Sequence, residues 1–127
     1  MSSADQKILA QIEAIESAYE FMLAYAAQGR DSDDKRAGGS EIEGVLSSLA
    51  TALTVLQDDA SNLGLPTQFQ TFAETLSMDA RNARGAVELV QIQARISSQL
   101  VDNLNASIHL RAVLTDLFLI DEALKCQ

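Results

Sequence analysis

Residues 42–63 read IEGVLSSLATALTVLQDDASNL, a run whose apolar side chains recur at alternating steps of four and three. Positions at those steps fall on one stripe of an α-helix, whereas a β-strand would alternate with a period of two. The run therefore predicts an amphipathic helix over about residues 41–63. Its stripe consists of Ile42, Leu46, Leu49, Leu53, Leu56, Ala60 and Leu63.

The same spacing recurs near the start of the chain and predicts a helix over about residues 4–28. Its stripe consists of Ile8, Ile12, Ile15, Tyr19, Met22 and Ala26. Gly29 and Gly64 stand where left-handed C-caps are expected, and Pro66 prevents the second helix from continuing. Ser3 and Ser40 each precede a Gln or Glu at capping-box spacing. Between the two helices, the polar residues 30–40 predict a mobile loop.

Beyond Pro66 the helical pattern resumes without a second strong breaker. Thr67 and Gln70 have capping-box spacing, and apolar residues then continue at helical spacing to Leu124. One unbroken helix over residues 68–125 would be roughly 85 Å long, too long for the first two helices to cover. We expect a break near residues 103–106 and a kink near residues 77–79, where Asn, Ser and Asp compete with the helix for backbone hydrogen bonds. The residues leave open whether 68–125 form one, two or three helices.

These patterns together predict an all-α fold. We expect an up-and-down antiparallel bundle of about four helices, the third being the longest, in a single domain over residues 1–127. The composition agrees, because 47% of the residues are hydrophobic and 21% are charged, which is typical of a folded chain.

Charge and targeting patterns exclude several classes of partner. The net charge of −9 argues against nucleic acid and against anionic membrane surfaces, since both require clustered Lys and Arg. No apolar run approaches the roughly 20 residues that span a bilayer. The start of the chain lacks the pattern of a secretory signal, and Cys126 has no second cysteine to pair with. We therefore expect a cytoplasmic protein.

Catalytic and metal-binding patterns are missing from the sequence. Di-iron bundles use Glu-x-x-His motifs, but the single histidine, His109, has no Glu three residues before it. Cys126 lies at the chain end without a base fixed near it, and no serine stands in a nucleophile motif. We expect no catalytic residue, no metal ligand and no cofactor.

His109 suggests one alternative function. It shares a polar stripe with Asp102, Asn105 and Asp116, and a histidine exposed on an acidic helical bundle resembles a histidine phosphotransfer domain. Those domains usually read His-x-Leu-Lys-Gly, whereas this chain reads His-Leu-Arg-Ala over residues 109–112. The resemblance implies a signalling domain with His109 as phosphoacceptor, although the Lys and Gly of the motif are absent.

A surplus of apolar residues supports a different function. The first helix has a second apolar face with Ala14, Ala18, Phe21 and Tyr25, and the last helix is apolar around most of its circumference. Such surplus faces are either buried within the monomer or meet another chain. We therefore predict a non-enzymatic protein–protein interaction protein, an adaptor or regulator, that forms a homodimer or binds a protein partner. The candidate interface residues are Phe21, Tyr25, Leu110, Leu114 and Phe118. A structural coiled-coil spacer is a third alternative, which requires the third helix to run unbroken to the end of the chain.

Overall fold

The computed structural model describes residues 3–29, 40–60 and 63–127, and in these ranges the chain is helical with no strand. The all-α prediction is confirmed for this part of the chain. The elements are α1 (Ser3–Ala27), α2 (Ser40–Asp59), the short 3-10 helix η3 (Thr67–Phe69), α3 (Gln70–Gln91), α4 (Ser98–Ala106) and α5 (Ile108–Lys125).

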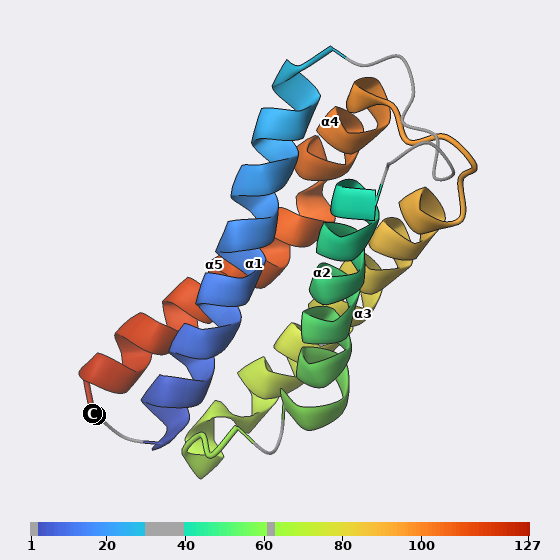
Figure 1. Cartoon of the computed structure of the whole chain (residues 1–127). Helices are drawn as coiled ribbons and strands as arrows, with labels where there is room; N and C mark the ends of the chain where they lie inside the picture. Colours follow the sequence, from blue (N-terminus) through green and yellow to red (C-terminus); the bar gives the residue numbers. More distant parts are fainter. Residues whose placement is uncertain (1–2, 30–39, 61–62) are drawn as a thin grey trace.

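The helices pack side by side, and the chain reverses direction between successive long helices (Figure 1). α1 packs against α2, α2 against α3, and α3 against α5. α4 and α5 follow one another along the remaining side, where both contact α1. Each long helix therefore buries one stripe against its neighbours, which is what the spacing of four and three requires.

The core consists of the stripes that the sequence predicts for α1 and α2. All seven stripe residues of the second helix are buried, and in the first helix only Tyr19 and Ala26 remain half-buried. α3 adds Leu76, Ala80 and Val87 from its inner face. The small side chains on α3 allow it to pack closely against its neighbours.

The glycine cap of the first helix is confirmed, because α1 ends at Ala27 and Gly29 has a φ of 67°. Gly64 is also left-handed, with a φ of 78°, but α2 ends at Asp59, four residues before the predicted end, so Gly64 is not the residue that follows the helix directly. The loop predicted over residues 30–40 and the side chains of Ser3 and Ser40 lie outside the described residues. The third capping box is wrong: α3 begins after η3 with Phe69 at its N-cap, and no side chain caps it.

The predicted kink at residues 77–79 is also wrong, because α3 continues through it. The Ser77 hydroxyl does not compete with the α3 backbone, since it donates to the Gln57 carbonyl oxygen of α2 at 2.6 Å. Nor is the third helix the longest, since α1 has 25 residues and α3 has 22.

The chain after α3 breaks twice, so residues 68–125 form three α-helices. One break is at Ser107, whose ψ of 148° is extended; it lies one residue beyond the predicted interval. The other, over residues 92–97, was not predicted. There Ser97 caps α4 by accepting a hydrogen bond from the Leu100 amide at 3.1 Å. Helical spacing continues through Val90, Ala94, Ser97 and Val101 and conceals this break in the sequence.

Candidate functional site

Two of the predicted interface residues belong to the core, so that part of the interface prediction is wrong. Tyr25 is 3% exposed and Leu110 is 1% exposed. The Tyr25 hydroxyl donates to the Ile96 carbonyl oxygen at 2.5 Å, and the Ser98 hydroxyl donates to the Tyr25 carbonyl oxygen at 2.8 Å. Tyr25 thus attaches the end of α1 to the start of α4 and is not open to a partner.

The other three candidates differ in exposure. Phe21 and Leu114 are half-buried and pack against the core, whereas Phe118 is 47% exposed. Most of the apolar circumference of α5 is covered by α1 and α3, because these helices contact it on two sides. Leu119, which follows Phe118 in the sequence, is also exposed. Together with Phe69 and Phe72 it lines a pocket of only about 170 Å³. That volume holds about one aromatic ring, since a cavity of ~150 Å³ accommodates benzene.

The polar stripe around His109 does not form one exposed face. Asn105 and Asp116 are buried, Asp102 is exposed and His109 is half-buried at the second position of α5. A stripe that joins Asp102 to Asp116 requires one continuous helix, whereas the break at Ser107 separates α4 from α5.

Asp116 instead meets a second carboxyl group across the interface of α3 and α5. It is 7% exposed and shares a side-chain hydrogen bond with Asp79, which is half-buried on α3. Burial, the hydrogen bond and the negative charge of Asp79 raise the pKa of Asp116 from 3.8 to about 8. The Asp116 carboxyl group therefore keeps its proton at neutral pH.

In the described ranges, no group of three or more His, Cys, Asp or Glu side chains is placed to hold a metal ion. Glu13, Glu16 and Glu20, the acidic group of the first helix, likewise form no such cluster. No helix of the described part is both long and apolar enough to cross a membrane.

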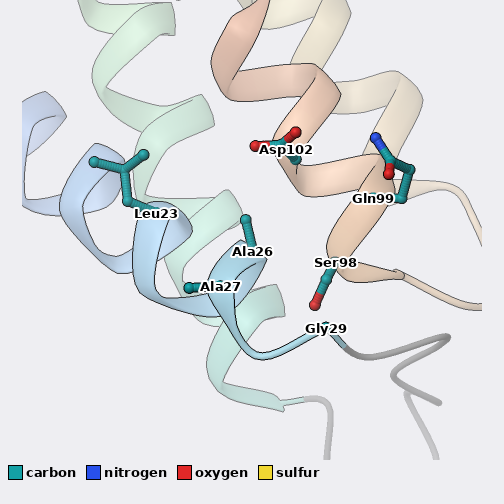
Figure 2. A pocket seen from close by; sticks show the side chains of 7 residues that line it. All are labelled: Leu23, Ala26, Ala27, Gly29, Ser98, Gln99 and Asp102. Carbon is teal, nitrogen blue, oxygen red and sulfur yellow. The ribbon is translucent and has the colours of Figure 1, made fainter.

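One pocket of about 460 Å³ lies between the end of α1 and α4 (Figure 2). Leu23 and Ala26 line it from α1, and Gln99 and Asp102 line it from α4. Two features of the described lining are negative: the Asp102 carboxylate, and the C-terminal end of α1, which has no basic residue in its last turn. The Ser98 hydroxyl also lines the pocket, and it donates a hydrogen bond to the Tyr25 carbonyl oxygen at 2.8 Å.

A larger groove of about 570 Å³ runs along the outside of α1 and α2. Each helix contributes four residues at positions i, i+3, i+4 and i+7, which is one face of an α-helix. The lining residues are Ala14, Ser17, Ala18 and Phe21 on α1 and Glu41, Gly44, Val45 and Ser48 on α2. Three of the four α1 residues belong to the second apolar face that the sequence identifies; the matching face of α2 was missed, although its spacing is the same.

The groove has two distinguishable ends. Because α1 and α2 run in opposite directions, Phe21 and Glu41 lie at one end, and Ala14 and Ser48 lie at the other. The α1 wall spans roughly 10 Å at 1.5 Å per residue, about two helical turns. The volume of the groove falls within the range of about 300–1,000 Å³ that is typical of binding sites.

No protein-family model matches this chain, and neither a curated protein nor a solved structure resembles it significantly. A functional assignment therefore depends on the geometry of the sites described above.

Proposed function

We propose that this protein is a non-enzymatic adaptor that holds an amphipathic helix of another protein in the groove between α1 and α2. The observation that carries the proposal is the matched spacing of the two walls. Two antiparallel helices that each present an i, i+3, i+4, i+7 face form a groove in which the apolar side of a third helix can bind. Self-association is the other way to cover this groove.

Gly44 supports the proposal because local structure does not require a glycine there. Its φ is ordinary for a helix, and a Cβ atom added to it would meet no heavy atom within 4 Å. A glycine inside a helix costs about 1 kcal/mol relative to alanine. Because it has no side chain, Gly44 leaves this part of the groove open.

Filling the groove at Gly44 is expected to abolish helix binding. The probe is a fluorescent peptide with leucines on one helical face and uncharged polar residues on the other, and its anisotropy measures affinity. In Gly44→Leu the new side chain occupies the groove, so we expect the affinity for the peptide to fall at least ~10-fold, which corresponds to about 1.4 kcal/mol. Circular dichroism should show native helicity, because the position has open space.

Gly85→Leu is the matched control. Gly85 is also helical with open space around its position, but it lies on the exposed side of α3, away from the groove. This variant should bind the peptide like the wild type. Equal affinities of wild type and Gly44→Leu, or no binding by either, would contradict the proposal. A loss confined to Gly85→Leu would move the docking surface to α3.

The alternative functions have less support in the geometry. The coiled-coil spacer requires an unbroken third helix, but the chain breaks after Gln91 and again at Ser107. The phosphotransfer alternative would use His109, which is half-buried at the second position of α5. A cytoplasmic location, which the exposed free thiol of Cys126 permits, is part of the same proposal.

A further inference from the structure

We infer that the helix bound in this groove is basic, with Lys or Arg flanking its apolar stripe. The inference rests on the proposed function and specifies the partner's chemistry. It depends on three carboxylates at the groove and on the uneven distribution of charge between the helices.

Three exposed glutamates lie in or beside the groove. Glu41 is part of the lining at the end near Phe21. Glu13 and Glu20 stand four residues before and three residues after Ser17, so they neighbour it on the solvent side of the α1 wall. A helix bound in the groove would place the edges of its polar face beside these three side chains.

The helices that form the groove also carry a larger excess of negative charge than the other helices. α1 and α2 together carry eight carboxylates and a single basic residue, Lys7. α3, α4 and α5 together carry four basic residues and seven carboxyl groups, one of which is the protonated Asp116. The half of the molecule that forms the groove therefore creates a negative potential that attracts a basic segment and speeds its association.

The same charges argue against a second copy of this chain as the occupant. Two copies docked groove to groove would bring their own Glu13, Glu20 and Glu41 together, and like charges facing each other across an interface are unfavourable. A basic helix is attracted by the same glutamates.

Selection from a displayed peptide library tests the inference directly. The probe is a phage library of helical peptides of about 18 residues, roughly 27 Å long, with leucines fixed on one stripe and the flanking positions randomised. Peptides are selected on the wild type after depletion on Gly44→Leu, so that only groove-dependent binders remain. We expect Lys and Arg to be enriched at the flanking positions.

The outcomes separate this inference from the proposed function. Groove-dependent peptides with neutral or acidic flanks would overturn the basic partner while keeping the helix-binding groove. If no peptide distinguishes the wild type from Gly44→Leu, both proposals fail. A chain that forms a groove-dependent dimer under the selection conditions would overturn the basic partner in favour of self-association.

A charge variant provides the second readout on a selected peptide. Combining Glu13→Gln, Glu20→Gln and Glu41→Gln should weaken binding by about two- to fivefold for each exposed ion pair that is lost. The control combines Glu74→Gln, Asp102→Asn and Glu122→Gln, which removes the same charge from exposed positions on α3, α4 and α5. Equal weakening by both variants would show that net charge, and not the groove carboxylates, sets the affinity.

Discussion

Raising the pH from about 5 to about 9 is expected to lower the free energy of unfolding by about 2 kcal/mol. The cause is Asp116, whose burial between α3 and α5, beside Asp79, raises its pKa to about 8. Each pKa unit corresponds to ~1.4 kcal/mol, so the roughly three units between pH 5 and this pKa correspond to ~4 kcal/mol; we take about half of that value because Asp79 is half-buried and water can screen the pair.

The sign follows from proton release on unfolding. The folded chain keeps the Asp116 proton up to about pH 8, whereas the unfolded chain loses it near the ordinary carboxyl pKa of 3.8. Between these values the unfolded state binds fewer protons, so stability falls as the pH rises. The stabilising contribution is complete below the unfolded pKa and is lost as the pH rises through the folded pKa.

Urea unfolding of Asp116→Asn at several pH values measures this contribution. The amide keeps the shape of the acid and can donate to Asp79, but it cannot ionise. The variant should match the wild type near pH 5, should exceed it by about 2 kcal/mol near pH 9, and should show a flatter pH profile. Asp102→Asn, at an exposed position of α4, should leave the wild-type slope in place. A wild-type stability that rises over this interval would show that the pair is not protonated.

Tyr25 and Phe21 are expected to differ sharply in their contribution to stability, although both belong to the apolar face predicted for the first helix. Tyr25→Ala should lower the free energy of unfolding by about 4 kcal/mol, because it removes a buried ring and the hydrogen bond to Ile96. Phe21→Ala should cost only about 1 kcal/mol, since Phe21 is half-buried beside the open groove.

Tyr25→Phe separates the ring from its hydroxyl. It should cost about 1–2 kcal/mol, because it leaves the Ile96 carbonyl oxygen without this donor. Thermal or urea unfolding followed by circular dichroism measures all three variants. A Tyr25→Ala variant as stable as Phe21→Ala would place both rings on the surface and would contradict the attachment of α1 to α4.

The first two helices could be predicted from the sequence because their local patterns and their tertiary packing agree. The stripes led by Ile8 and Ile42 are regular, and glycines in the left-handed region end or follow them. The chain after Pro66 was harder. The break over residues 92–97 depends on how α4 packs against α1, through Tyr25, Ile96 and Ser98, and contacts so distant in the sequence leave no local pattern.

Only the α1 side of the groove could be predicted from the sequence. The α1 wall was visible as a second apolar face, with Ala14, Ala18 and Phe21. The α2 wall has the same spacing, but Gly44 and Ser48 are not hydrophobic and do not stand out in an apolar pattern. The burial of Asp116 was not foreseen either, because its partner Asp79 lies on another helix.

An amide chemical-shift map of the labelled protein, recorded during titration with a library-selected helical peptide, tests the helix-binding groove most directly. We expect the largest shifts at groove residues such as Ser17, Gly44 and Ser48. The exposed positions Met78 and Leu89 on α3 should remain unshifted. Shifts concentrated on α3 or α5, with the α1 and α2 walls unaffected, would contradict a helix-binding groove.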